Sequence, residues 1–229
     1  MRGMRAAVAV LAVIILIAVS QARSAPSPPA MPGPGSGLVA LPSPDLDGGL
    51  SLEEALARRR SERSFSSEAL TRAEVGQLLW AAQGVTDGQG RRTAPSAGAT
   101  YPLELYAVIP EGVYHYLPAG HALSLVRAGD VRGELGAAAL GQESVAAAPL
   151  VVVITGVVAR TAARYGSRAE RYTWLEAGHA AQNVLLQAVA LDLGAVPVGA
   201  FDDARVRDVV RAPADEAPLY LLPVGHRAP

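Results

Sequence analysis

Arginine residues and a serine are grouped in the segment Arg59–Arg63, which reads Arg-Arg-Ser-Glu-Arg. A guanidinium group is permanently charged and presents a planar fork of N–H donors that suits phosphate oxygens. Arg59, Ser61 and Arg63 could therefore converge on the phosphate and the anionic edge of a ligand. The cluster also ends a predicted helix, where arginines complement the helix dipole and are solvated. From composition alone, this second interpretation is favoured.

A second candidate segment is Gly90–Glu104, which contains two prolines and many small residues. We expect a constrained loop here rather than a helix. Pro95, Ser96 and Ala97 come directly before Gly98, so the loop offers a hydroxyl group and a backbone that can approach a planar ligand closely. A plain turn between two elements explains the same residues equally well.

A long apolar stretch, Glu176–Leu193, predicts the helix around which the rest of the chain is organised. It leaves little polar face, and a helix that is apolar nearly all round must be buried on several sides. Gly194 follows where a left-handed glycine commonly ends a helix. Pro197 and Gly199 then shape a turn whose backbone amides could face a ligand.

Residue types that are missing exclude several classes of chemistry. The 229 residues include no cysteine, which excludes disulfides, iron–sulfur clusters and a thiol nucleophile. Every basic residue is arginine, which excludes Schiff-base catalysis by lysine. The net charge of −1 provides no basic field of the size that nucleic acid requires.

The histidines are not spaced as metal ligands, and we expect no metal site. They are His115, His121, His179 and His226. His179 lies in the central apolar stretch and is predicted to be a hydrogen-bonded core residue. The sequence also lacks the G-x-S-x-G, Walker A and G-x-G-x-x-G motifs. A bound organic cofactor is therefore the expected carrier of any chemistry.

The remaining elements must position these segments. Ser51 is a predicted helix N-cap, Thr71 with Glu74 forms a predicted capping box, and Asp202 or Asp203 is expected to cap a short helix. Strands are predicted at 105–109, 113–117, 149–155 and 218–224, helices at 130–140 and 142–147, and a polar cover at 160–171. Helices and strands do not alternate regularly, so we expect an α+β sandwich.

The N-terminal residues predict export. Arg2 and Arg5 precede an unbroken apolar run of 14 residues, Ala6–Val19, shorter than the about 20 that a bilayer-spanning helix needs. Small residues follow at cleavage spacing. We expect a signal peptide or short membrane anchor at 1–24, a Pro/Gly-rich linker at 25–44 and one folded domain at 45–229. The protein is then periplasmic, extracellular or membrane-anchored, and it is cytoplasmic if Met31 is the true start.

Several segments together resemble the FMN-dependent nitroreductase family, in particular its SagB-type (azoline) dehydrogenase branch. They occur in the family's order and extend over residues 50–225. The matching segments are Arg59–Phe65, Gln77–Gly84, Arg92–Glu104, Tyr172 with Glu176–Asn183, Gly194–Asp202 and Pro218–Gly225.

This resemblance implies a three-layer α+β sandwich, with a mixed sheet and helices on both faces, that forms a homodimer. One FMN is expected in each of two clefts at the subunit interface. Arg59 and Ser61, with Arg60 beside them, match the positions that hold the FMN phosphate. Arg63 matches a basic position near the pyrimidine edge of the flavin, where reduction places negative charge. The resemblance therefore favours the phosphate interpretation of the arginine cluster.

Two further segments match the family's flavin contacts. Pro95, Ser96 and Ala97 match a loop that approaches the flavin from the other subunit. Pro197, Gly199 and Ala200 match a turn whose backbone amides reach the flavin N5 and O4 edge. Family members usually have a further basic residue near the C-terminus for the phosphate, and Arg227 is the available candidate here.

The sequence departs from the branch at its catalytic pair. Azoline-oxidising members tend to have a Lys-Tyr pair ahead of the central helix, and this chain has Arg164-Tyr165 in a similar place. An always-charged arginine replaces a base whose pKa can be tuned, so azole synthesis is not expected. Tyr165, with Arg164 beside it, remains the candidate proton donor.

The implied function is an FMN-dependent oxidoreductase that transfers a hydride or electron pair through flavin N5 to or from a small organic substrate. NAD(P)H is the family's electron donor, but an exported protein would need a different one. The alternative is an FMN-binding scaffold or accessory protein with reduced catalysis, and flavin-fragmenting chemistry matches less well. Substrate specificity is expected to lie in 115–127 and 160–171.

Overall fold

The computed structural model describes residues 37–228. The expected leader, 1–24, and most of the expected linker, 25–44, lie outside this range. Strand β1 (Leu38–Ala40) already belongs to the sheet, where it pairs antiparallel with β4 (Ala122–Ala128). The folded part therefore begins before residue 45. Within the described range, no helix combines the length and the apolar character needed to cross a membrane.

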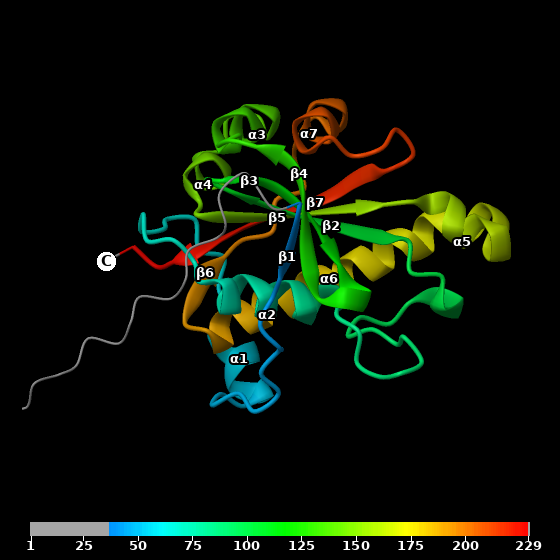
Figure 1. Ribbon diagram of the computed structural model, residues 1–229, viewed down its shortest axis with the longest axis horizontal. Coiled ribbons are helices and arrows are strands. Elements are labelled where there is room, and N and C mark those ends of the chain that lie inside the picture. Colours follow the sequence, from blue (N-terminus) through cyan, green and yellow to red (C-terminus); the bar gives the residue numbers. More distant parts are fainter. Residues whose placement is uncertain (1–36, 229) are drawn as a thin grey trace, which may run out of the picture.

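One sheet of seven strands runs through the molecule in the order β1-β4-β3-β2-β5-β7-β6 (Figure 1). Its other strands are β2 (Leu103–Ile109), β3 (Gly112–Leu117), β5 (Leu150–Gly156), β6 (Leu193–Ala195) and β7 (Ala217–His226). β5 is buried along its whole length, as its unbroken apolar sequence predicts. The four strands predicted from the sequence are confirmed, and β1, β4 and β6 are additional.

The strands pair antiparallel at every junction of the sheet. A mixed sheet was expected, and the parallel component in the described residues is a single bridge, between Ser61 and Ala195. This bridge lies at the outer edge, on β6. The α+β class is confirmed, with the parallel pairing confined to this position.

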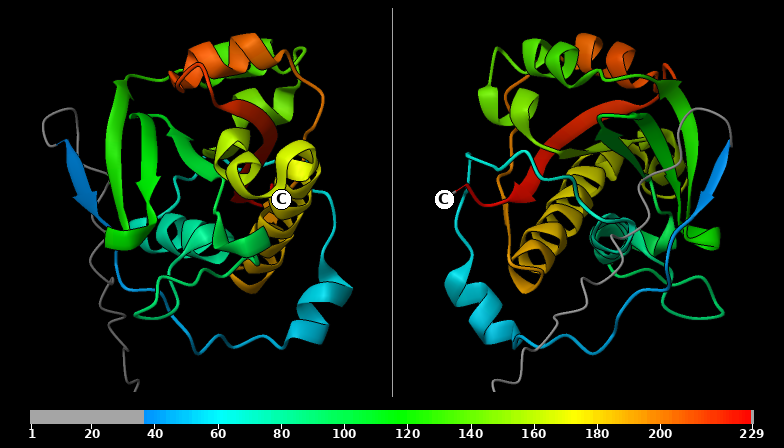
Figure 2. Two further views of the ribbon diagram at one scale, coloured as in Figure 1. Left: turned by 90° about the vertical axis from the view of Figure 1, so that its right-hand side faces the viewer. Right: turned by 60° about the vertical axis from the view of Figure 1, so that its left-hand side comes forward.

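Helices cover both faces of the sheet (Figures 1 and 2). On one side lie α1 (Leu52–Arg58), α2 (Arg72–Gln83) and α6 (Ala169–Ala190), and on the other lie α3 (Arg132–Ala138), α4 (Glu143–Ala147) and α7 (Asp203–Val210). Two separate hydrophobic clusters fill the space between the layers, one on each side of the sheet. The structure is therefore the expected three-layer sandwich.

The predicted helix caps are confirmed. Ser51 Oγ accepts a hydrogen bond from the Glu54 N–H at 3.1 Å. At the start of α2, Thr71 N donates to Glu74 Oε2 at 2.7 Å and Glu74 N donates to Thr71 Oγ1 at 3.2 Å, which completes a capping box. Asp202 caps α7 by accepting from the Arg205 N–H at 3.0 Å.

The end of α6 differs from the sequence expectation. Asp192, with φ of 57°, adopts the left-handed conformation that was expected of Gly194. Gly194 lies inside β6. A glycine is needed there for space, because a Cβ atom would lie 2.8 Å from Glu62 Cβ.

The segment 160–171, predicted as a polar cover, lies in α5 (Val158–Tyr165), a short 3-10 turn (Gly166–Arg168) and the first turn of α6, and its covering role stays a prediction. The expectation for His179 is wrong, because this side chain is exposed on α6 rather than buried in the core. Trp174 and Leu175 are also uncovered, with exposed fractions of 57% and 55%. One face of the central helix therefore lacks a covering layer among residues 37–228.

Candidate active site

The arginine segment lies against β6. Arg59 ends α1 with an extended backbone, and Ser61 then forms the parallel bridge to Ala195. The Glu62 N–H donates to the Ala195 carbonyl at 3.0 Å. Because alternate side chains of an extended segment face opposite sides, Arg59, Ser61 and Arg63 share one side. Neither Arg59 nor Arg63 forms a salt bridge within the described residues.

Arg60 and Arg227 lie together on the other side of this segment. They line a cavity of about 460 Å³ between α1, α6 and the end of β7; the lining residues are Ala57, Arg58, Arg60, Glu62, Val189, Asp192 and Arg227. Arg60 Nη1 donates to the carbonyls of Ala57 and Arg59, and Arg227 Nη1 donates to Asp192 Oδ1 at 3.3 Å. The structure thus separates these two arginines from Arg59, Ser61 and Arg63.

The turn Pro197–Ala200 follows β6 directly. Val198 is held by two hydrogen bonds to Leu221, at 2.8 and 3.0 Å. Gly199 and Ala200 are exposed, and their N–H groups have no hydrogen-bond acceptor within residues 37–228. A Cβ on Gly199 would meet only Tyr220 Cε1, at 3.9 Å. Two successive amide donors of an exposed turn therefore have no acceptor in the described residues, which leaves them free to bind a ligand.

A hollow of about 430 Å³ opens beside this turn. It is lined by Glu170, Trp174, Ala177, Gly199, Phe201, Asp203, Ala217, Pro218, Leu219 and Tyr220. Three aromatic side chains give it flat apolar walls, which suit a planar ring system. The hollow places the free amides of the turn against the N-terminal half of α6.

The loop predicted to contact the ligand has a strained backbone. Gly98, Ala99 and Tyr101 have φ of 59°, 53° and 45°. For Ala and Tyr this left-handed conformation is unfavourable, and such strain gathers at functional sites. Ser96 Oγ accepts a hydrogen bond from the Tyr101 N–H at 2.9 Å. This contact closes the loop on itself.

The expected catalytic pair packs on the same loop. Arg164 Nη1 donates to the Gly98 carbonyl at 3.3 Å. A Cβ on Gly98 would lie 2.6 Å from the Tyr165 hydroxyl and 2.9 Å from Arg164 Cδ. Thr161 of α5 also meets the loop, through a 2.9 Å hydrogen bond between its hydroxyl and that of Thr100. The structure therefore brings Arg164 and Tyr165 together with the loop.

A buried polar cluster that the sequence did not predict lies near this loop. Glu176 of α6 has an exposed fraction of 3%, and Gln83, at the end of α2, has one of 0%. Arg92 donates to Gln83 Oε1 at 2.9 Å and stacks over the Tyr101 ring at 4.5 Å. Burial raises the pKa of the Glu176 carboxyl to about 7, although Ser96, Arg92 and Gln83 oppose the rise. A glutamate within an apolar helical stretch was the available signal.

The central helix α6 separates the loop from the turn. Trp174 and Ala177 line the hollow that contains Gly199, whereas Glu176 faces Ser96. Helical residues two positions apart point about 200° away from each other. Trp174 and Glu176 therefore point to different sides of α6, the first toward the turn and the second toward the loop.

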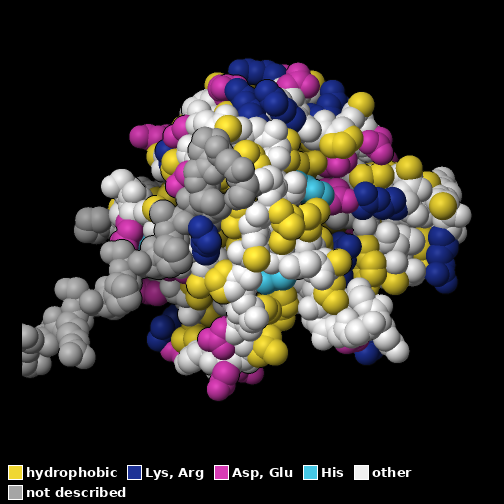
Figure 3. Space-filling view, in the orientation of Figure 1, with side chains coloured by type: hydrophobic (Ala, Val, Ile, Leu, Met, Phe, Trp, Pro, Cys, Tyr) yellow, Lys and Arg dark blue, Asp and Glu magenta, His cyan; other side chains and the backbone are white. Residues whose placement is uncertain are grey.

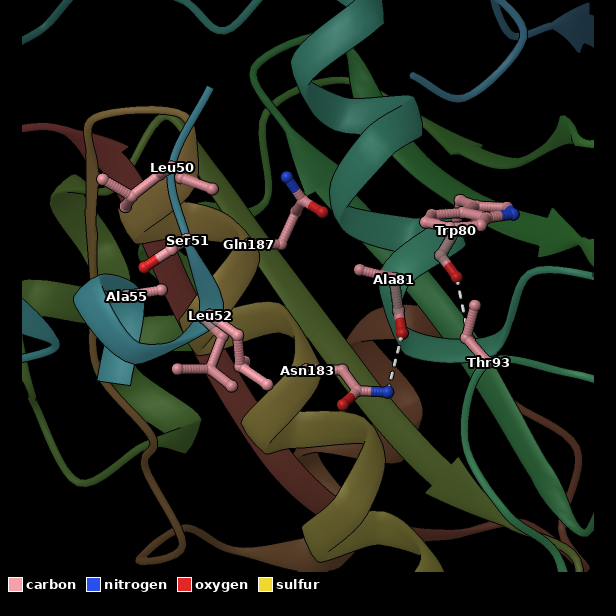
Figure 4. A pocket seen from close by; sticks show the side chains of 11 residues that line it. Leu50, Ser51, Leu52, Ala55, Trp80, Ala81, Thr93, Asn183 and Gln187 are labelled. Atoms are coloured by element: carbon pink, nitrogen blue, oxygen red, sulfur yellow. Dashed lines mark hydrogen bonds between the residues drawn. The ribbon is translucent and has the colours of Figure 1, made fainter. Parts of the chain in front are cut away.

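The uncovered face of α6 continues into an apolar cleft of about 340 Å³ between α1, α2 and α6 (Figure 4). Leu52 of α1 and Trp80 of α2 line it, and Asn183 Nδ2 bonds the Ala81 carbonyl at 3.0 Å on its floor. Arginines gather elsewhere, at the top of the molecule over α3 and α7, with separate ones over the projecting end formed by α5 (Figure 3). Both the cleft and the exposed Leu175 offer apolar surface that a second chain can cover.

The groups present fit FMN. Its phosphate requires cationic and hydroxyl donors, which Arg59 and Ser61 supply without a competing carboxylate partner in the described residues. The polar edge of its ring requires donors in the ring plane, which the free amides of Gly199 and Ala200 supply. The bridge between Ser61 and Ala195 joins the two sets of donors on adjacent backbone.

Comparison with known proteins agrees with this architecture. Residues 56–226 match the model of the nitroreductase family. A nitroreductase-named protein of Methanocaldococcus jannaschii is 45% identical over 190 residues, which cover 80% of this chain and 94% of that protein.

Two solved structures are similar as well. One, named as a nitroreductase of Ralstonia eutropha, has a TM-score of 0.78 and 32% identity and covers 86% of this chain and 94% of its own. A chain of the Escherichia coli microcin synthetase McbBCD complex has a TM-score of 0.66 and 23% identity and covers 82% and 77%, a likeness in fold alone. The matches in sequence and in fold together establish that this chain belongs to the nitroreductase family.

Proposed function

We propose that this protein is an FMN-dependent oxidoreductase of the SagB-type branch, which transfers a hydride or electron pair between a donor and a small organic substrate. The observation that carries the proposal is the pair of free amide donors at Gly199 and Ala200, attached through Ala195 to the arginine segment. Bound FMN supplies reversible two-electron transfer at N5. The chain's own residues bind and orient it.

Each donor has a distinct task. Arg59 and Ser61 hold the phosphate through charge-assisted hydrogen bonds. Arg63 lies on the same side of the extended segment and stabilises negative charge at the pyrimidine edge of the ring. The Gly199 and Ala200 amides fix the opposite polar edge. Arg60 and Arg227 are already engaged with carbonyl and carboxylate oxygens and contribute positive potential from the far side.

The active unit is a homodimer. The 57% and 55% exposed fractions of Trp174 and Leu175 and the apolar cleft beside α1 provide a continuous surface for a second copy. In such a pair, the loop Pro95–Ala97 of one subunit covers the ligand held by the turn of the other. This arrangement overcomes the separation that α6 imposes within one chain. It also excludes water from the reacting face.

Tyr165 is the proposed proton donor to the substrate, and its position against Gly98 of the loop supports this role. Arg164 orients the loop by binding the Gly98 carbonyl. Because an arginine cannot act as a base near neutral pH, reduction of an acceptor is favoured over azoline oxidation. The reductant is a two-electron donor, either NAD(P)H or, for an exported protein, a donor outside the cytoplasm.

The hydrogen bond from Arg164 to the Gly98 carbonyl also favours a second function. Arg164 is engaged with a backbone carbonyl, a structural task that requires no turnover. An FMN-binding scaffold or accessory protein would retain every donor described above. The likeness to a chain of the McbBCD complex, a multi-subunit synthetase, motivates this alternative.

An absorbance spectrum of the purified protein tests the proposal. A flavin spectrum, or uptake of added FMN, is expected, followed by bleaching when NADH, NADPH or a reduced mediator is added without oxygen. A colourless protein that does not take up FMN would contradict the flavoprotein proposal. Bound FMN that no donor reduces supports the scaffold.

We also propose that residues 1–24 direct export. N-terminal sequencing of protein recovered from a cell fraction outside the cytoplasm would identify the cleavage site. Full-length protein found only in the cytoplasm would contradict export.

A further inference from the structure

Glu216 is a buried carboxyl that no cation neutralises. It lies in the connection between α7 and β7, and it takes part in no salt bridge within residues 37–228. Its Oε2 instead accepts two hydrogen bonds from hydroxyl groups, from Tyr106 of β2 at 2.9 Å and from Thr155 of β5 at 2.5 Å. Burying a carboxyl is costly unless hydrogen bonds satisfy it. These two donors therefore hold Glu216 at one position against the sheet.

The two hydroxyl groups depend on Glu216 in turn. Both Tyr106 and Thr155 are buried, and Glu216 is the acceptor that the structure gives to each hydroxyl. Burial, together with the charge of Glu216, raises the pKa of Tyr106 above its ordinary value, so its hydroxyl stays protonated and remains a donor. Removing the carboxyl would leave two buried donors without an acceptor, which costs more than the hydrogen bonds themselves contribute.

The ladder between β5 and β7 is irregular directly after Glu216. Thr155 pairs with Pro218, whereas the preceding residue of β5 pairs with Tyr220. Leu219 is therefore an extra residue of β7, a bulge, that has no partner on β5. Pro218 also lacks the N–H group that a ladder residue can donate. Backbone pairing alone constrains the start of β7 weakly, and the side-chain hydrogen bonds of Glu216 supply a further constraint.

The start of β7 forms one wall of the candidate site. Ala217–Tyr220 line the hollow of about 430 Å³. The next residue, Leu221, forms both hydrogen bonds that hold Val198 of the turn, at 2.8 and 3.0 Å. Tyr220 lies beside the turn, since a Cβ on Gly199 would be 3.9 Å from Tyr220 Cε1. A change of register at the start of β7 would therefore move both the wall and the turn.

We propose that Glu216 is a positioning residue that fixes the register of Ala217–Tyr220. It thereby sets the wall of the hollow and the direction of the Gly199 and Ala200 amides. Because it acts through the backbone of β7, it is not a catalytic residue. The binding of FMN by the turn rests on the proposed function, whereas the anchoring of β7 does not and can be measured on the protein without any ligand.

Three variants separate the hydrogen bonds from a general loss of stability. Glu216→Ala removes the acceptor. Glu216→Gln keeps a side-chain oxygen that can accept from both hydroxyl groups. Asp215→Asn is the matched control, because Asp215 is the adjacent carboxyl, is exposed and forms no salt bridge within the described residues.

Amide hydrogen exchange in the ligand-free protein is the test. The protection factors of the Val198 and Leu221 amides are each divided by that of the Glu62 amide, which bonds the Ala195 carbonyl on the same edge of the sheet. Glu216→Ala should lower these ratios about tenfold, and Glu216→Gln should stay within about threefold of wild type. The ratios in Asp215→Asn should equal those of wild type.

Unchanged ratios in Glu216→Ala would overturn the inference, and so would an equal fall in protection at all three amides, which indicates only global destabilisation. The same loss in Glu216→Gln as in Glu216→Ala would contradict the hydrogen-bond mechanism. If Glu216→Ala does not fold, Thr155→Val decides, because it removes one donor and keeps the shape of the side chain. A several-fold fall in the ratios of that variant supports the inference, and unchanged ratios overturn it.

Fluorescence titration with FMN and with riboflavin connects the anchor to the site. Because the turn binds the edge of the ring rather than the phosphate, Glu216→Ala should weaken the binding of both flavins by the same factor, about tenfold. Wild-type affinity for both flavins in a variant with the exchange loss would overturn the connection to the ligand. A wild-type protein that binds neither flavin removes the proposed function and leaves the exchange result intact.

Discussion

Ser61 pairs in parallel with Ala195, and this bridge attaches the arginine segment to the strand that leads into the Pro197–Ala200 turn. Glu62 N donates to Ala195 O at 3.0 Å beside it. Two groups of donors more than 130 residues apart in sequence therefore lie on adjacent backbone. Gly194 makes the approach possible, because a Cβ there would collide with Glu62.

Replacing Arg59 with Gln should weaken FMN binding by about 10- to 100-fold, since a charge-assisted hydrogen bond contributes about 1.5–3 kcal/mol. Arg60→Gln is the matched control, because Arg60 is bound to the Ala57 and Arg59 carbonyls on the other side of the segment. Fluorescence titration with FMN measures both. Riboflavin, which lacks the phosphate, should bind both variants equally. A larger loss of FMN affinity in Arg60→Gln than in Arg59→Gln would mean that the phosphate is bound on the Arg60 side of the segment.

Leu175→Arg should convert the proposed homodimer to a monomer. This side chain is 55% exposed on the uncovered face of α6, and an unpaired charge buried between two copies costs several kcal/mol. The dissociation constant should rise by at least about 100-fold, and FMN binding should fall with it. Leu140→Arg is the control, since Leu140 is 68% exposed next to α3 on the other side of the sheet. Analytical ultracentrifugation that finds a dimer in Leu175→Arg contradicts the prediction.

Gly98→Ala should distort the loop. Its φ of 59° disfavours a side chain, and the new Cβ would lie 2.6 Å from the Tyr165 hydroxyl. A loss of about 1–2 kcal/mol is expected in the free energy of unfolding, together with weaker FMN binding. Gly133→Ala, within α3 and in open space, should be neutral or stabilising. Equal effects of the two substitutions in urea unfolding would show that the Tyr165 contact is unimportant.

The stability of the protein should fall as pH rises through neutrality, to an extent set by Glu176. Burial raises the pKa of this carboxyl from 4.5 to about 7, so folding favours its neutral form. This contribution is fully present below pH 4.5 and is lost as pH rises through about 7. By linkage it amounts to at most about 3 kcal/mol. Glu176→Gln should remove this part of the pH dependence.

Urea unfolding at about pH 5 and about pH 8 measures the difference, bracketing that pKa. Wild type should lose more stability than Glu176→Gln between the two pH values. If the free energy of unfolding changes between the two pH values by the same amount in Glu176→Gln as in wild type, a group other than Glu176 titrates.

Much of the fold could be predicted because it depends on local patterns. The Thr71–Glu74 capping box and the Asp202 cap are short-range hydrogen bonds, and the structure confirms them. β5 was recognisable from its unbroken apolar run. β1 and β6, each of three residues, gave no such signal, because strands this short exist only through their partners.

Within the site, the sequence by itself determined which donors are present: the permanently charged guanidinium groups, the Ser61 and Ser96 hydroxyls, and a glycine at 199 that leaves a backbone amide exposed. Tertiary structure decided how they are grouped. The bridge to Ala195 put Ser61 on the side away from Arg60, and α6 put the loop and the turn on different sides. Burial alone made Glu176 a carboxyl that titrates near neutrality. These outcomes depend on contacts between distant residues and on exclusion of water, which local sequence patterns do not encode.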